Sequence, residues 1–165
     1  MNVKKIAIVL GSDSDLNIAE KCVKVLKTLG LEFTVNIISA HRTPEKAREF
    51  AINARENNYG VIIAIAGKSA ALAGVLAAHT RLPVIGVPVM SQDLGGLDAL
   101  LSSVQMPPGV PVACVAIDGG ANAAWLAARI LSINNDDLAQ KLEIETQKMS
   151  ESVEKKNHDI QAKFL

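Results

Sequence analysis

Short runs of apolar residues alternate along the chain with longer segments in which apolar residues recur three or four positions apart. The runs lie at 6–10, 33–38, 61–66, 84–89 and 112–117. They are almost entirely apolar, which is typical of parallel strands covered by helices on both faces. The pattern predicts an α/β fold in three layers, with a doubly wound parallel sheet of flavodoxin-like or Rossmann-like type.

Helices are predicted between these runs, at 16–29, 44–57, 70–79, 97–104 and 121–133. Thr43 is expected to cap the second helix with its side-chain oxygen, and Pro44 suits a first helical turn, where a missing N–H costs nothing. Gly30 is expected to end the first helix in the left-handed conformation.

Beyond residue 134 the composition becomes charged and polar, with a narrow apolar stripe. The stripe consists of Leu138, Leu142, Met149, Val153 and Ile160. At 100° per residue these positions span only about 60° of arc, too little to anchor a long helix on its own core. We therefore expect one domain over 1–165, with 134–165 as a C-terminal helical extension used in oligomerisation. A partly frayed, solvated tail is the alternative.

Composition narrows the function classes. Seventeen basic and seventeen acidic residues balance, and only 3% of the residues are aromatic, so nucleic acid is not an expected partner. No apolar run approaches the roughly 18–20 residues of a membrane span, and we expect a cytoplasmic protein with no membrane partner. Cys22 and Cys114 have no spacing typical of a metal site or a disulfide, and both are expected to be small buried residues.

Ligands of open α/β sheets bind beyond the carboxyl ends of the strands. The loop after the first run reads GSDSD at 11–15. Its small residues allow close backbone approach before a helix N-terminus, and its two aspartates suit ribose hydroxyls better than phosphate. Ordinary helix capping is the alternative interpretation, because serine and aspartate are common caps.

The loop after the second run reads SAHRTP at 39–44. His41 offers an imidazole, which can exchange protons near neutral pH, beside the Arg42 guanidinium, which suits phosphate. A surface histidine and a solvated arginine are the alternative. His79 and His158 are expected at the surface.

Three further function classes are disfavoured, two of them by the loop at 67–74, which reads GKSAALAG. Its Gly-Lys-Ser is similar to the end of a P-loop, but the earlier glycine of that motif would fall at Ile62, within a strand, so we reject a nucleotide triphosphatase. No G-x-G-x-x-G follows a strand, which disfavours a dinucleotide enzyme. A receiver module, the non-enzymatic alternative, would need an aspartate where Gly67 stands. The loop at 90–98 is expected to be a mobile cover or an ordinary connection.

Four separated motifs, at 11–15, 39–44, 86–89 (GVPV) and 103–107 (SVQMP), together resemble the PurE family. The resemblance implies a flavodoxin-like fold, a homo-octamer in which C-terminal helices embrace neighbours, and a step of de novo purine synthesis without cofactor or metal. The implied reaction moves the carboxyl group of N5-carboxyaminoimidazole ribonucleotide to C4, with carbon dioxide trapped as an intermediate and His41 carrying the proton.

The same resemblance implies roles in binding the nucleotide substrate. Ser12 and Asp15 would hold the nucleotide and Arg42 its phosphate. Ser39 and the loop at 67–74, called the third loop below, would shape the pocket around the base and the migrating carboxyl group. The implied substrate-binding residues are Ser12, Asp15, Ser39, Arg42, Gly67, Lys68, Ser69, Ala70 and Leu72.

The third loop departs from the mutase pattern, since Ala71 stands where bacterial mutases typically carry a histidine. The loop is more similar to that of the carboxylases that use carbon dioxide directly. Arg42 and the segment 86–107 are similar to the mutases. We therefore predict a mutase, with direct aminoimidazole ribonucleotide carboxylase as the alternative.

Overall fold

The apolar runs pair into one parallel sheet in the computed structural model, which describes residues 3–164. The strands are β1 (Lys5–Leu10), β2 (Phe33–Ile37), β3 (Tyr59–Gly67), β4 (Val84–Val89) and β5 (Ala113–Cys114). Their order across the sheet is β2-β1-β3-β4-β5. This is the flavodoxin-like order, so the sheet is flavodoxin-like rather than Rossmann-like.

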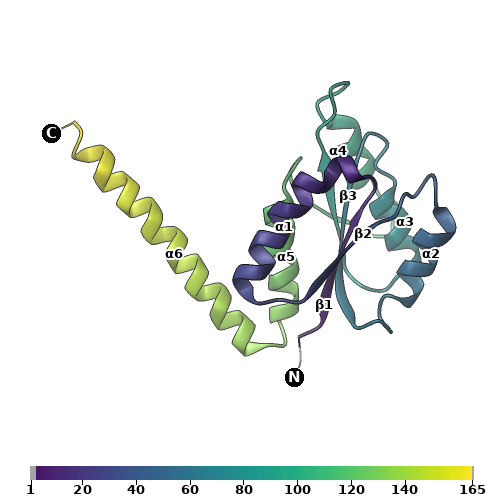
Figure 1. Cartoon of the computed structure of the whole chain (residues 1–165), viewed down its shortest axis with the longest axis horizontal. Coiled ribbons are helices and arrows are strands. Elements are labelled where there is room, and N and C mark those ends of the chain that lie inside the picture. Colours follow the sequence, from purple (N-terminus) through teal and green to yellow (C-terminus); the bar gives the residue numbers. More distant parts are fainter. Residues whose placement is uncertain (1–2, 165) are drawn as a thin grey trace.

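Helices cover both faces of the sheet. They are η1 (Asp13–Asp15), α1 (Leu16–Leu29), α2 (Pro44–Asn53), α3 (Leu72–His79), α4 (Leu97–Val104), α5 (Gly120–Ser132) and α6 (Asp136–Gln161). In Figure 1, α1 and α5 lie on one side of the strands and α2 and α3 on the other. A Cβ atom at Gly86 would touch both Ala73 of α3 and Ser103 of α4, so α4 shares the face of α3. The predicted three-layer α/β architecture is confirmed.

Side chains of β1 show why the central strands have almost no polar positions. Ile6 and Ile8 pack into the core beneath α1 and α5, whereas Ala7 and Val9 pack into the core beneath α2 and α3. All four are fully buried. Because side chains alternate between the two faces of a strand, a sheet covered on both faces needs apolar residues at every position.

Strand β5 is shorter than the predicted run at 112–117. Its ladder with β4 is limited to Ala113 and Cys114. Pro88 of β4 explains the early end, because proline has no N–H to donate to the next rung. The backbone of Asp118 still donates to the Pro88 carbonyl at 2.9 Å, so the chain follows β4 without forming a strand.

Helix α2 also ends early, at Asn53 instead of residue 57. The following turns close at Asn58, which adopts a left-handed φ of 64° that asparagine tolerates. The prediction that Thr43 caps α2 through its side chain is wrong, since its hydroxyl makes no capping bond to the helix. Gly30 does end α1 in the left-handed conformation, with φ 67°.

The tail forms a single helix, α6, that extends away from the body of the molecule (Figure 1). The expectation that the whole stripe is unable to pack on its own core is wrong for its first part, because Leu138 and Leu142 belong to the core beneath α1 and α5. Lys141 supports this docking by donating to the carbonyl of Leu29 at 3.4 Å. Met149 and Val153, farther along, are 48% and 66% exposed.

Cys22 is fully buried and its thiol donates to the carbonyl of Gly120 at 3.0 Å, as expected for a structural cysteine. Burial raises the pKa of this thiol to about 12. Cys114 is only partly buried, so the prediction for it is wrong in degree. Within residues 3–164, no helix is long and apolar enough to cross a membrane.

Candidate active site

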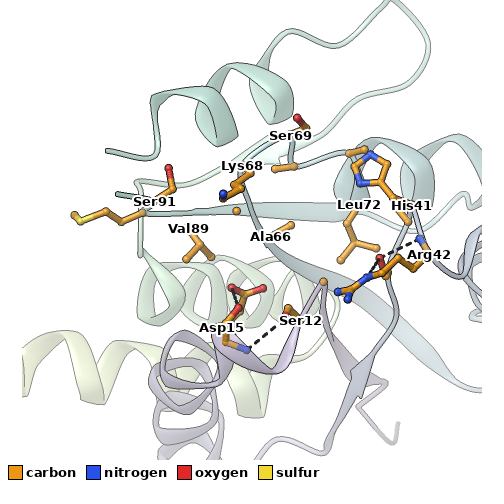
Figure 2. Close-up of a pocket in the computed structure, with 18 of the residues that line it drawn as sticks. Ser12, Asp15, His41, Arg42, Ala66, Lys68, Ser69, Leu72, Val89 and Ser91 are labelled. Carbon is orange, nitrogen blue, oxygen red and sulfur yellow. Dashed lines mark hydrogen bonds between the residues drawn. The ribbon is translucent and has the colours of Figure 1, made fainter. Parts of the chain in front are cut away.

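A pocket of about 740 Å³ opens at the carboxyl ends of β1, β2, β3 and β4. It lies beside the topological switch point between β1 and β3, where successive strands stop being added on one side of β1 and continue on the other. Open α/β sheets bind their ligands at such a point. Every predicted site residue lines this pocket, several of them visible in Figure 2: Ser12, Asp15, Ser39, His41, Arg42, Gly67, Lys68, Ser69, Ala70 and Leu72. Residues up to 60 positions apart in the sequence thus meet in one site.

The loop after β1 contributes one buried carboxyl group and one serine hydroxyl. Ser12 caps the short helix η1, its Oγ accepting from the backbone N–H of Ser14 at 3.4 Å. Asp15 is only 6% exposed, and its Oδ1 accepts from the Ser14 hydroxyl at 3.2 Å. Ser12 therefore caps η1, and Ser12 and Asp15 also line the pocket.

Burial raises the pKa of the Asp15 carboxyl above its ordinary value. The negative charges of Asp13 and Asp118 add to the rise, while hydrogen bonds from the Ser14 side chain and the Ser12 backbone oppose it. A carboxylate held in this way gains from a ligand that donates hydrogen bonds to it, as a pair of hydroxyl groups does.

Asp15→Asn is expected to stabilise the fold at neutral pH. Because the folded-state pKa of Asp15 is raised, ionising this carboxyl costs stability once the pH exceeds its unfolded value of about 4. Melting temperatures should be measured from pH 3 to pH 8. At pH 7 the variant should melt at a higher temperature than the wild type, by about 2–4 °C for each 1 kcal/mol of unfolding free energy gained. The gap should close toward pH 3.

Asp13→Asn is the matched control for this experiment, because Asp13 is the exposed acidic neighbour in the same loop. It should change the melting temperature much less. A lower melting temperature for Asp15→Asn than for the wild type at pH 7 would contradict the argument.

The loop after β2 is a closed turn that fixes the direction of Arg42. The backbone N–H and the Nε of Arg42 both donate to Ser39 Oγ, at 3.2 and 3.4 Å. Thr43 completes the turn: its hydroxyl accepts from the Ser39 N–H at 3.1 Å and donates to the Ser39 carbonyl at 3.0 Å. This is the bonding that replaces the predicted helix cap. His41 projects from the same turn and is exposed at the pocket.

The loop after β3 forms the opposite wall of the pocket. Lys68 has a φ of 53°, the left-handed conformation that lysine rarely adopts. The next turn is held by the Ala70 N–H, which donates to the Lys68 carbonyl at 2.8 Å. Gly67 comes close to Val89 of β4, since a Cβ atom there would lie 3.6 Å from the Val89 carbonyl oxygen.

The loop after β4 also lines the pocket, with Met90, Ser91, Gln92 and Asp93. The sequence predicts this segment as a mobile cover or an ordinary connection, and not as part of the site. Asp93 pairs with Lys68, Nζ to Oδ2, at 3.1 Å. The rule that ligands bind at strand ends applies equally to β4, so this loop could have been included.

Asp118 was also missed. Its Oδ1 accepts from the backbone N–H of Met90 at 3.0 Å and so holds the start of the β4 loop. Like Lys68, it adopts a left-handed conformation, with a φ of 58°. No sequence pattern marks this contact, because Asp118 and Met90 are 28 positions apart.

The segment 103–107, by contrast, lies outside the pocket. Ser103 is buried and its hydroxyl donates to the Ala99 carbonyl within α4. The Met106 side chain packs against Gly74, since a Cβ atom at Gly74 would lie 3.2 Å from the Met106 sulfur. Ser103 and Met106 of this motif therefore act in packing, and the motif does not line this pocket. In the part of the chain from 3 to 164, no cluster of histidine, cysteine and acidic side chains could hold a metal ion.

A flavodoxin-like sheet with a polar pocket at its switch point, bearing an imidazole, a guanidinium and a buried carboxyl group, defines an α/β enzyme for a small anionic ligand. The family model described as AIR carboxylase matches residues 5–152. The chain belongs to this family, also known as PurE.

Two relatives illustrate the similarity. N5-carboxyaminoimidazole ribonucleotide mutase of Pyrococcus abyssi is 53% identical over 142 residues, which are 86% of this chain and 82% of that protein. The mutase of the same name from Methanocaldococcus jannaschii is 51% identical over 159 residues, 96% and 99% of the two chains. The crystal structure of Treponema denticola PurE aligns with a TM-score of 0.86 at 31% identity, covering 94% of this chain and 97% of that one.

Proposed function

We propose that this chain is an N5-carboxyaminoimidazole ribonucleotide mutase of purine biosynthesis. The observation that carries the proposal is that the ten residues implied by the PurE resemblance all line one pocket. Relatives named as this mutase, about half identical over most of their length, support it. The proposed setting is the cytoplasm.

Substrate binding is assigned to two of the loops. Arg42, directed by its bonds to Ser39, would bind the nucleotide phosphate, because a guanidinium offers several fixed donors to phosphate oxygens. Ser12 and Asp15 would bind the ribose hydroxyls, which can donate to the buried carboxyl group. The base and its carboxyl group would then face His41 and the loop after β3.

His41 would carry the proton through both half-reactions. Its imidazolium donates a proton to N5 while the bond from N5 to the carboxyl carbon breaks, which releases carbon dioxide and aminoimidazole ribonucleotide. Carbon C4 then attacks the carbon dioxide, and the now neutral imidazole removes the proton from C4. The carboxylate ends on C4, the imidazolium is restored, and no net proton or electron is exchanged.

The carbon dioxide must stay beside C4 between the two steps. The loops after β3 and β4 stand on one side of the pocket and are joined by the Lys68–Asp93 pair, and they would limit its escape and the entry of water. The chemistry involves neither redox change nor phosphoryl transfer, so the proposal includes no cofactor.

A direct carboxylase remains the second candidate because the third loop carries Lys68 and Ser69, with Ala71 where mutases typically have histidine. The two are separated by supplying the purified protein with either the N5-carboxylated nucleotide in carbon-dioxide-depleted buffer or aminoimidazole ribonucleotide with bicarbonate. Efficient formation of the C4-carboxylated product from the first substrate supports the mutase. Formation only from the second, rising with bicarbonate, would replace it with the carboxylase.

The outer half of α6 is proposed to pack on a neighbouring subunit of an octamer. Met149, Val153 and Ile160 are all about half exposed or more on a helix that extends from the body (Figure 1). Burying such apolar surface between subunits would be favourable by about 25 cal/mol per Å².

Truncation after Thr146 is expected to reduce the assembly while leaving the subunit folded, because Leu138 and Leu142 are retained in the core. Val153→Lys should weaken assembly in the full-length chain. Glu151→Lys, on the opposite side of α6, is the matched control. Sedimentation at micromolar concentration provides the measurement, and a monomeric full-length chain would contradict the proposal.

A further inference from the structure

The ion pair between Lys68 and Asp93 joins the loops after β3 and β4 at the wall of the pocket. The Lys68 Nζ and Asp93 Oδ2 atoms are 3.1 Å apart, and both residues line the pocket. In Figure 2 the Lys68 ammonium lies above Asp15 and well apart from Arg42. The pair therefore places a cation at a second position in the site.

Stability does not account for this pair. The two side chains are 74% and 66% exposed, and exposed ion pairs contribute little to folding. The backbone of Lys68 adopts a φ of 53°, which glycine adopts at lower cost. Strained conformations of this kind cluster at functional sites, where the side chain is needed. The ammonium group, not the backbone, is the reason for a lysine here.

The charges of the pocket match a ligand with two separated anionic groups. Arg42 and Lys68 are the arginine and lysine of its lining, and they come from loops after different strands. The substrate of the proposed reaction carries a phosphate at one end and a carboxylate on the base at the other. With Arg42 directed by Ser39 and assigned to the phosphate, Lys68 is left to face the carboxylate.

We infer that Lys68 selects the carboxylated nucleotide by binding its carboxylate, which replaces Asp93 as the partner of the ammonium. The inference rests on the proposed function and adds a specificity residue to it. Asp93 acts as a competitor for the cation. Because the pair is exposed, it can be exchanged at small cost.

Two substitutions should therefore have opposite effects. Lys68→Met removes the cation and should weaken binding of a carboxylated nucleotide about tenfold or more, as expected for a hydrogen bond to a charged group. Asp93→Asn removes the competitor and should tighten it by about twofold to fivefold. If the pair only held the two loops together, both substitutions would weaken binding in the same direction.

The test is calorimetric binding of 4-carboxyaminoimidazole ribonucleotide and of aminoimidazole ribonucleotide, which differ by the carboxylate alone. Lys68→Met should lose affinity for the first and keep its affinity for the second within about twofold, which also demonstrates a folded pocket. Lys46→Met, at an exposed lysine of α2 outside the pocket, is the matched control and should change neither affinity.

Equal loss of affinity for both nucleotides in Lys68→Met would assign the lysine to the phosphate or to loop closure and overturn the inference. Weaker binding of the carboxylated nucleotide by Asp93→Asn would overturn it as well. In both cases the wild-type chain would still convert its substrate. A wild-type chain that binds neither nucleotide would overturn the proposed function and the inference together.

Discussion

His41→Asn is expected to reduce turnover by about 10²–10⁴-fold while leaving nucleotide binding close to that of the wild type. Asparagine approximates the size of the imidazole and keeps a polar side chain, but it cannot accept and return a proton near neutral pH. His41 lies in the turn from Ser39 to Thr43 and is exposed at the pocket, so the substitution should not disturb the core.

The effect should be confined to the rate of chemistry. Arg42 remains directed by Ser39, whose bonds do not involve the His41 side chain. Initial rates of C4-carboxylated product formation give kcat, and calorimetry with the product gives the affinity. His79→Asn, at the exposed end of α3, is the matched control and should retain full turnover. A His41→Asn variant with near-normal turnover would remove the proton-transfer mechanism.

Local signals fixed some element boundaries well and others poorly. The range 16–29 predicted for the first helix matches α1 because Gly30 ends it through its own conformational freedom. The strand predicted at 112–117 was too long because its length depends on Pro88, a residue of the neighbouring strand. A sequence pattern shows the residues of one strand, whereas the ladder also needs donors from its partner.

The pocket could be predicted because the rule for open α/β sheets converts strand ends into a location. His41 and Lys68 belong to loops after different strands, yet both line the pocket. The same rule covers the loop that holds Asp93, but it does not predict the individual contacts of Asp93 or Asp118. Their contacts, to Lys68 and to the Met90 N–H, depend on how loops cross in space, which hydrophobic patterning does not specify.

Leu138 and Leu142 show the same limit at the tail. Their spacing predicted a helical stripe correctly, but the stripe alone did not reveal that its first part completes the core against α1 and α5. The docking depends on Leu29 at the end of α1, whose carbonyl accepts from Lys141. Only the remainder of the stripe is left for a neighbouring subunit.

The crossing of α1 and α5 is the place where a single added methyl group should cost most. A Cβ atom at Gly120 would overlap the carbonyl oxygen of Ile18 and lie 3.0 Å from its Cγ2 atom. The backbone of Gly120 is also fixed by the Cys22 thiol, which donates to its carbonyl. Small buried residues continue the contact along α5: Ala123, Ala124, Ala127 and Ala128. The two helices therefore have no free space into which a side chain at 120 could extend.

Gly120→Ala is expected to destabilise the fold by about 3 kcal/mol, at the upper end of overpacking effects, because the obstructing atom belongs to the backbone and cannot rotate away. This corresponds to a fall in melting temperature of about 6–12 °C. Asn122→Ala, at an exposed position two residues along α5, adds helix propensity without a clash and should be neutral or slightly stabilising. Urea unfolding of both variants gives the difference in free energy. Equal stability of Gly120→Ala and the wild type would show that α5 can move away from α1 freely, and the close helix crossing would then not be a determinant of this fold.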